Sequence, residues 1–382
     1  MDIYFDNSAT TKPHNSVIDA MVNMMKDAYG NPSSLHTKGV EAERMVKKAR
    51  EHVAKALKVN ADEVYFTSCG TESNNIAILG IAMAQRIKGE VITTKVEHKS
   101  VTEPFKYLEK MGFKVHYLDV DSSGIIDLSK LEELLNDNTQ LVSIIQVNNE
   151  CGMVQPIKEI SRIIKRKNEK TLLHIDAVQG FCKVELPKNC ADLISISAHK
   201  IHGPKGVAAL YVRKGVKISP IIYGGGQEKS LRSGTENTPA IVGFGVAAEL
   251  AKKEDNYNYV LNLKNTMLEK IIDSIPNVYI NSPQESSPYI LNISVMGIRS
   301  EILLHSLEQR GVYVSSGSAC SSNRPKPSHV LIAMGFSMER VDSSIRISFC
   351  PNNTMQEVLS ACEILIEVVQ NINKLGALKN NG

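Results

Sequence analysis

Short apolar runs alternate with helical patterns over the first two-thirds of the chain. Runs typical of buried strands lie at 63–67, 90–94, 113–118, 141–147, 172–176, 193–196 and 207–212. Helical patterns lie between or after them, at 71–86, 101–111, 128–135 and 156–167. Strands that alternate with helices of this length predict parallel pairing, with helices on both faces of the sheet. We therefore expect an α/β fold built on a mostly parallel seven-stranded sheet.

The pattern changes from about Pro239 onward. A long helical region at 240–274 precedes a strand at 289–295, a helix at 300–310, a strand at 344–349 and a final helix. This order predicts a smaller α+β unit. The first 14 residues precede the alternation and have no place inside it, so we expect them to join the smaller unit. The predicted large domain is 15–245, and the predicted small domain combines 1–14 with 246–382.

Composition narrows the class of protein. Hydrophobic residues make up 42% and charged residues 22%, which is ordinary for a globular protein. A net charge of +3 gives no reason to expect a nucleic-acid or membrane partner. The seven cysteines are scattered without CxxC pairs, which argues against a disulfide framework and a structural zinc site. With no signal-peptide pattern and no apolar run near membrane length, we expect a cytoplasmic protein.

The strongest chemical signal is the segment Asp192–Gly206. An apolar strand leads directly into Ser197-Ala-His199-Lys200 and then into a Gly/Pro turn. A lysine at the mouth of a parallel sheet can lose hydration, and its neutral amine then becomes available for a Schiff base. Taken alone, the motif favours an ordinary surface lysine at position 200. A metal site at His199-x-x-His202 is disfavoured, because the pair lies in a loop and not on one helix face.

Three other positions follow predicted strands, whose ends line the ligand crevice of an open parallel sheet. Asp176 could pair with the pyridinium nitrogen of an aromatic cofactor, so that the ring continues to act as an electron sink. His98 could lie over the face of such a ring. Ser68–Asn75 brings glycine and small polar residues to a helix start, which suits a phosphate. Each feature alone has an ordinary reading, such as a helix cap, but together they indicate a cofactor site.

A second cluster lies in Val314–Val330. Cys320 is surrounded by Ser, Gly and Pro, which predicts an exposed loop. Nearby Arg324, Lys326 and His329 would favour the thiolate. Downstream, Arg346 stands among apolar neighbours on a predicted strand, where it could grip a substrate carboxylate or form a structural ion pair.

The segment Gly243–Ala248 matches the GxGxxA dinucleotide fingerprint. The stretch before it looks helical and lacks the strand that the fingerprint requires. We interpret its small residues as a close helix contact.

These motifs together resemble the cysteine desulfurases of the NifS/IscS type. These are class V aminotransferases of the fold type I pyridoxal 5'-phosphate (PLP) enzymes, and the loop around Cys320 resembles the longer, group I form. The resemblance covers nearly the whole chain. The matching stretches are Tyr4–Thr11, Gly30–Ser34, Val147–Glu150, His174–Gln179, Ser197–Lys200, Arg232–Thr235, Ser315–Cys320 and Ser344–Arg346.

The resemblance implies a role for each site residue. Lys200 would hold PLP as a Schiff base and later move the Cα proton, while His98 would stack on the ring. The other cofactor residues implied are Asp176, Asn149, Gln179, Gly70, Thr71, Ser197 and His199, with Thr235 reaching in from the second subunit of a homodimer. Arg346, helped by Asn149, would bind the carboxylate of L-cysteine. Cys320 would take the sulfur as a persulfide, releasing alanine, and pass it to an acceptor protein for iron–sulfur cluster assembly or for tRNA or cofactor thiolation.

Two departures from the family pattern stand out. The phosphate loop reads Ser68-Cys69-Gly70-Thr71 where the family usually has Ser-Gly-Ala-Thr, which brings an oxidisable thiol near the cofactor. The C-terminus lacks the acidic and aromatic tail by which the housekeeping enzymes dock their scaffold, so the acceptor stays open.

Other readings also stay open. They are a selenocysteine lyase or another class V PLP enzyme and, less favoured, a sulfur carrier without catalysis. No resident metal is expected, apart from a transient iron–sulfur cluster contact at Cys320.

Overall fold

A seven-stranded sheet forms the centre of the larger part of the protein. The structure, a computed structural model, describes residues 2–85, 87–253, 256–316 and 327–380. The strand order is β2-β8-β7-β6-β5-β3-β4. The bounds are β2 Val64–Thr67, β3 Glu90–Thr94, β4 Lys114–Leu118, β5 Thr139–Ile145, β6 Leu172–Asp176, β7 Leu193–Ser197 and β8 Ala208–Val212. Every neighbouring pair is parallel except those of β8, which runs antiparallel to β2 and β7. The predicted mostly parallel seven-stranded sheet is confirmed.

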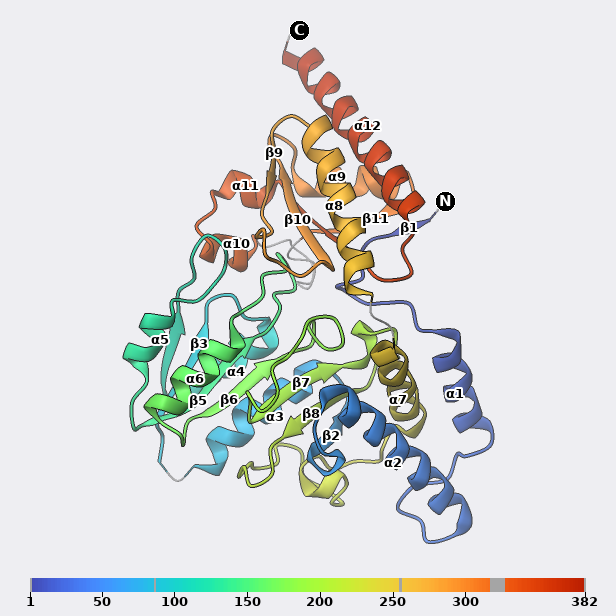
Figure 1. Ribbon diagram of the computed structural model, residues 1–382, viewed down its shortest axis with the longest axis vertical. Helices are drawn as coiled ribbons and strands as arrows, with labels where there is room; N and C mark the ends of the chain where they lie inside the picture. The colour runs from blue at the N-terminus through green and yellow to red at the C-terminus, as the bar shows by residue number, and fades with distance from the viewer. Residues whose placement is uncertain (1, 86, 254–255, 317–326, 381–382) are drawn as a thin grey trace.

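Helices cover both faces of this sheet (Figure 1). One face packs against α2 (Thr37–Leu57), α5 (Leu128–Leu134), α6 (Ile157–Lys167) and α7 (Thr238–Lys253), with α1 (Asn15–Lys26) lying on α7. The other face packs against α3 (Gly70–Ala84) and α4 (Lys99–Lys110). Both cores are apolar, with Val53, Ile160 and Phe244 fully buried on one side and Ile76 and Phe105 on the other. Burial of both faces explains why these strands read as continuous apolar runs.

Glycines allow α7 to lie close to its neighbours. A Cβ atom on Gly245 would fall 2.5 Å from the Cα atom of Ala49 in α2. A Cβ atom on Gly243 would fall 2.9 Å from Cγ of Met21 in α1. The fingerprint-like segment is therefore a helix-packing surface, as its sequence context predicted.

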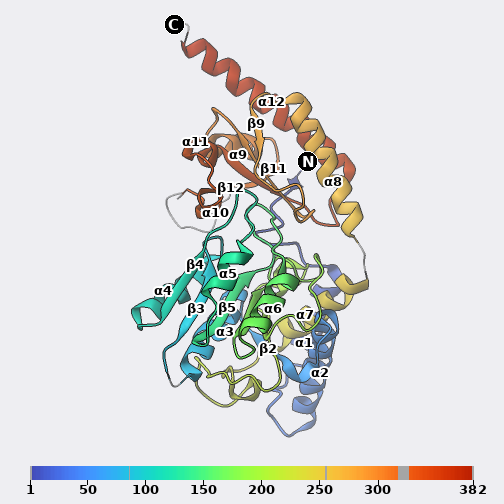
Figure 2. The same ribbon diagram turned by 60° about the vertical axis from the view of Figure 1, so that its left-hand side comes forward.

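The smaller part has its own sheet, with strand order β12-β13-β10-β9. The strands are β9 Val278–Ile280, β10 Ile290–Val295, β12 Ser315–Ser316 and β13 Ser344–Ser348, and all pair antiparallel. Its helices are α8 Tyr257–Ser274, α9 Ser300–Glu308, α10 His329–Ala333, α11 Met338–Asp342 and α12 Met355–Asn380. Figures 1 and 2 show α8 and α12 along one side of this unit, with α12 rising past it to the C-terminus.

The first residues of the chain lie in this smaller unit. Strand β1 (Ile3–Tyr4) pairs in parallel with β11 (Val312–Tyr313), and Asp6 forms a bridge with Ser348. Ile3 and Phe5 are buried in the core formed by α8, α9, α12 and β10. Residues 3–6 therefore pack against the smaller unit, whereas the backbone N–H groups of Thr11 and His14 donate to the carbonyls of His199 and His202 in the larger one.

The region 240–274 differs from its prediction as one helical stretch. It contains two helices, because α7 ends at Lys253 and α8 begins at Tyr257. The predicted domain boundary at residue 245 falls inside α7, and Ala247 and Ala248 belong to the core of the large sheet. We place the division of the chain after α7 instead. None of the helices that the structure describes is long and apolar enough to cross a membrane.

Candidate active site

Most of the candidate residues follow the carboxyl ends of neighbouring parallel strands. His98 follows β3, Asn149 follows β5, Asp176 ends β6, and Lys200 follows β7 in a short 3-10 turn, Ala198–Lys200. These strands lie side by side in the order β7-β6-β5-β3. The sheet therefore brings four separate sequence motifs to one edge, as expected for a crevice of this fold.

A buried hydrogen-bond chain joins Asp176 to His98. The Nδ2 atom of Asn74, in α3, donates to Oδ2 of Asp176 and to Oγ of Ser100, both at 2.8 Å. Ser100 Oγ in turn lies 2.7 Å from Nδ1 of His98. Asp176 Oδ1 accepts from the backbone N–H of Val178 at 3.0 Å. The carboxylate and the imidazole are thus fixed relative to each other by two side chains between them.

The same contacts define the protonation of His98. Its Nδ1 accepts from the backbone N–H of Ser100 at 3.1 Å, so the ring proton of the neutral form lies on Nε2. Burial lowers the pKa of His98, Asp176 opposes this, and Lys200 adds to the lowering. His98 is therefore neutral near pH 7 and can present a ring face without a charge.

The Lys200 amine contacts the segment of residues 6–11, called here the N-terminal segment. Its Nζ donates to the carbonyl of Ser8 at 2.5 Å and to that of Ala9 at 2.9 Å. Gln179 Nε2 donates to the same Ser8 carbonyl at 2.9 Å. His199 Nδ1 lies 3.2 Å from Oγ1 of Thr10, and burial lowers the pKa of His199 to about 3. The N-terminal segment thus forms hydrogen bonds with three candidate site residues, Gln179, His199 and Lys200.

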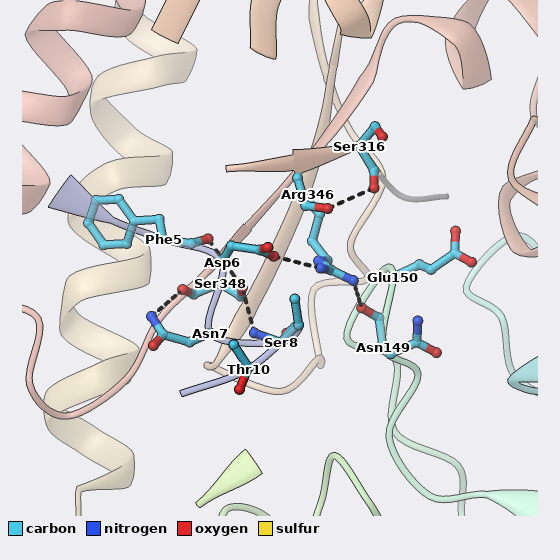
Figure 3. A network of polar contacts seen from close by, with 12 residues as sticks. Phe5, Asp6, Asn7, Ser8, Thr10, Asn149, Glu150, Ser316, Arg346 and Ser348 are labelled. Carbon is cyan, nitrogen blue, oxygen red and sulfur yellow. Dashed lines mark hydrogen bonds and ion pairs between the residues drawn. The ribbon is translucent and has the colours of Figure 1, made fainter. Parts of the chain in front are cut away.

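Arg346 contacts the other end of the N-terminal segment (Figure 3). Its Nη2 lies 2.7 Å from Oδ1 of Asp6, and its Nη1 donates to the backbone carbonyl of Asn149 at 2.9 Å. The structural ion pair considered for Arg346 is present. Nε of Arg346 is buried without a partner among the described residues, so the guanidinium keeps capacity for a carboxylate. Asn149 reaches Arg346 through its backbone and not through its side chain.

The predicted phosphate loop lies at the start of α3, which begins at Gly70. A Cβ atom on Gly70 would fall 2.9 Å from a methyl group of Val178, so an alanine at this position would require that side chain to shift. Ser197 Oγ is buried without a hydrogen-bond partner in the described part of the chain. An orphaned hydroxyl beside a helix N-terminus fits a phosphate group. Cys69 caps this helix from an exposed position, so its thiol is accessible beside the loop.

The roles of two further residues stay predictions. Thr235 is exposed and lines a cavity of about 180 Å³ with Ser68 and Arg232 of its own chain, so its role across a subunit interface stays a prediction. Cys320 lies outside the described residues. A second cavity, of about 600 Å³, opens beside Thr71 and His98 between α3 and α4.

Comparison with known proteins identifies the family. The family model described as Aminotransferase class-V matches residues 3–360 of this chain. The cysteine desulfurase IscS of Dictyoglomus turgidum is 41% identical over 384 residues, which covers 99% of this chain and 97% of that protein. The chain belongs to the cysteine desulfurases of the class-V aminotransferase family. The resemblance drawn from the sequence is confirmed.

Solved structures agree with this membership of the cysteine desulfurases. A NifS-like protein is 42% identical, with a TM-score of 0.91 that covers 97% of this chain and all of that one. A structure of SspA in complex with cysteine is 36% identical, with a TM-score of 0.82 over 93% of this chain and 100% of that chain. Enzymes of this family depend on PLP, and the residues described above fit that cofactor.

Sequence reasoning missed several side chains of this desulfurase-like site. Asn74 was included only in the predicted phosphate segment 68–75, and Ser100 was given no role, although together they connect Asp176 to His98. Asp6 was quoted within the family pattern without a role. The usable signal for Asn74 was its place one turn into a helix that starts at the phosphate loop.

Proposed function

We propose that this chain is a PLP-dependent cysteine desulfurase that converts L-cysteine to L-alanine and transfers the sulfur to Cys320. The observation that carries the proposal is that one short segment, residues 6–11, contacts both the Lys200 amine and the Arg346 guanidinium. An amino acid presents an amine and a carboxylate on the same carbon. A site for its chemistry needs an amine-exchanging lysine and a carboxylate-binding arginine within reach of each other.

The cofactor would be held by residues that surround the strand ends. Asp176 would face the ring nitrogen, His98 would cover the ring, and Gly70, Thr71, Ser197 and His199 would receive the phosphate. Gln179 and Asn149 would flank the ring and the substrate. When bound, PLP supplies an electron sink for the carbon next to the amine. Asp176 accepts two hydrogen bonds, from Asn74 and from the backbone N–H of Val178, which hold its carboxylate in place for a partner such as the ring nitrogen.

Arg346 would bind and orient the carboxylate of cysteine through two parallel N–H donors. Asp6 and the Asn149 carbonyl fix the plane of its guanidinium. Lys200 would carry the proton from the substrate Cα, with its amine steered by the carbonyls of Ser8 and Ala9 when it is released. The Cys320 thiolate would then attack the substrate sulfur.

The sulfur transfer balances without a further reactant. A sulfur–sulfur bond forms to Cys320 while the Cβ–S bond breaks, and Cβ takes up a proton. The reaction is L-cysteine plus the thiol of Cys320 giving L-alanine plus a persulfide on Cys320. The thiolate of Cys320 is the nucleophile, so its reactivity sets the pH range of this step.

The partners belong to the same proposal. The persulfide would pass to an acceptor protein that serves iron–sulfur cluster assembly or the thiolation of tRNA or a cofactor. The working unit would be a homodimer in which Thr235 of one subunit reaches the phosphate site of the other. The cysteines are odd in number and scattered along the chain, which supports a reducing location, the cytoplasm.

Turnover measurements on variants test the proposal. The wild-type protein with PLP is expected to release equal amounts of alanine and sulfide from L-cysteine in the presence of a thiol reductant. Lys200→Ala should lose this activity, and Cys320→Ser should lose it while still changing the cofactor absorbance when cysteine is added. Cys182→Ser, a half-buried cysteine away from the site, serves as the matched control. Full turnover by Cys320→Ser would overturn the persulfide step, and activity confined to selenocysteine would favour a lyase.

A further inference from the structure

Ser328 follows Cys320 by eight residues in the sequence. Ser328 is the N-cap of α10, and its Oγ accepts from the backbone N–H of Leu331 at 3.1 Å. Ser328 is only 4% exposed although it precedes a helix of just five residues. Because Ser328 is so completely buried, its hydroxyl proton needs a hydrogen-bond acceptor inside the protein.

That second contact is Glu150. Ser328 Oγ donates to Oε2 of Glu150 at 2.5 Å, and Glu150 is itself 5% exposed. Burial raises the pKa of Glu150, while the hydrogen bond from Ser328 lowers it. A hydrogen bond to a buried carboxyl group is costly to break, because the group that remains has no water to replace the donor. The Glu150–Ser328 contact is therefore a firm attachment point.

Glu150 follows directly on Asn149, whose carbonyl accepts from Arg346. Figure 3 shows the Glu150 side chain extending away from Arg346 while the Asn149 carbonyl faces it. The Oδ1 atom of Asn148 accepts from the backbone N–H of Glu150 at 2.8 Å and from that of Cys151 at 3.0 Å, which makes this turn rigid. One turn thus contacts the candidate carboxylate arginine on one side and the start of α10 on the other.

His329 provides a second attachment. Its Nε2 lies 2.9 Å from the backbone carbonyl of Glu97, the residue before His98. Residues 328 and 329 are therefore tied to the two turns that carry Asn149 and His98.

We infer that Ser328 and Glu150 are positioning residues for sulfur transfer, holding the chain that follows Cys320 at a fixed place relative to Arg346 and His98. The inference rests on the proposed function and assigns the pair to the second half of the reaction, after cysteine has bound. Among the described residues, neither side chain hydrogen-bonds to Lys200 or Arg346. Their contribution is to fix the position of residue 328 relative to Arg346 and His98, because small displacements of reacting groups reduce the rate strongly.

The experiment compares two serines with the same local role. Ser337 is the N-cap of α11, another five-residue helix, and its Oγ accepts from the backbone N–H of Arg340. Ser328→Ala and Ser337→Ala each remove one cap from a short helix, but only the first removes a donor to Glu150. Ser328→Thr keeps the hydroxyl group and is expected to restore wild-type behaviour.

Two readouts separate positioning from a structural defect. The concentration of L-cysteine that half-saturates the change in cofactor absorbance is expected to be unchanged in all variants. The single-turnover rate of persulfide formation on Cys320, followed by thiol-specific alkylation, should fall about tenfold in Ser328→Ala only. Equal rates for Ser328→Ala and wild type would overturn the inference, as would equal losses in Ser328→Ala and Ser337→Ala. If the wild-type protein itself forms no persulfide, the proposed function fails instead.

Discussion

The side chains of Asp6 and Arg346 form an ion pair at 2.7 Å although 340 residues separate them in the chain. Arg346 is nearly buried, with 5% of its side chain exposed, and this partner and the Asn149 carbonyl offset the cost of burying its charge. A guanidinium held in one plane offers its remaining donors in a fixed direction. The ion pair is therefore compatible with the proposed carboxylate-binding role of Arg346.

Replacing Arg346 by lysine should weaken the binding of L-cysteine. A lysine ammonium keeps the charge but cannot make two parallel hydrogen bonds to a carboxylate. We expect KM for L-cysteine to rise by about 10- to 100-fold, the effect of a lost hydrogen bond between charged groups. Steady-state kinetics measure it. Arg340→Lys is the control, because Arg340 packs on Phe336 outside the site and should leave KM unchanged. An unchanged KM in Arg346→Lys would remove Arg346 from substrate binding.

Removing the Asn74 side chain should disturb the cofactor through Asp176. Asn74→Ala takes away a 2.8 Å hydrogen bond to the Asp176 carboxylate and leaves Ser100 without its donor. The expected loss in kcat is about tenfold, with an altered pH dependence of the cofactor absorbance. Asn75→Ala is the matched control, since Asn75 is half-buried and donates within its own helix to the backbone carbonyl of Thr71. If both variants behave alike, Asn74 has no special connection to the cofactor.

Stability should fall as the pH drops below about 6.5, in part because of His174. This imidazole is fully buried between Ser143 and Ser195, at 2.8 and 3.0 Å, and burial lowers its pKa to about 3. In the unfolded chain the His174 imidazole binds a proton below about pH 6.5, whereas in the folded chain it binds a proton only below about pH 3. The lowered folded pKa therefore contributes stability above pH 6.5, which is lost progressively as pH falls.

Urea titrations at pH 7, 6 and 5 would measure this loss. The limiting slope for one such group is about 1.4 kcal/mol per pH unit. His174→Gln should flatten the pH dependence, whereas His305→Gln, at an exposed position, should not. A pH dependence identical in His174→Gln and wild type would show that His174 contributes nothing to it.

Gly245→Ala should destabilise the protein more than Gly243→Ala. The new methyl group at 245 meets the Cα atom of Ala49 at 2.5 Å, and a backbone atom inside a helix cannot move alone. The new methyl group at 243 meets side-chain atoms of Met21 and Pro204, of which the flexible methionine can shift. We expect a loss of about 1–3 kcal/mol for Gly245→Ala, the usual cost of overpacking. Urea midpoints compare the two, and a larger loss at 243 would contradict this account of the α2–α7 contact.

Most strands of the large sheet were predictable because they are buried on both faces and appear as apolar runs in the sequence. The gathering of His98, Asp176 and Lys200 followed from the same pattern, since parallel strands place their carboxyl ends at one edge. Strands β9, β11 and β12 were not predicted. They have two or three residues each, and their conformation is set by the strands beside them, not by a pattern of their own.

The contacts that complete the candidate site were also beyond local sequence reasoning. Asn74 reaches Asp176 across 102 residues, and Ser328 reaches Glu150 across 178. Such contacts depend on how the strands are ordered, which apolar patterns do not specify. The break between α7 and α8 was hidden for a related reason, because helical periodicity continues on both sides of it.

The position of residues 3–6 in the fold has a consequence for synthesis of the protein. Residues 3–6 are translated before the large sheet, yet β1 pairs with β11 and Asp6 pairs with Arg346, both of which are translated after that sheet. The sheet that carries His98, Asp176 and Lys200 is translated earlier and can fold as a unit while synthesis continues. The proposed carboxylate-binding site therefore cannot form until Arg346 has emerged from the ribosome. If that proposal holds, incomplete translation products that end before Arg346 do not bind cysteine.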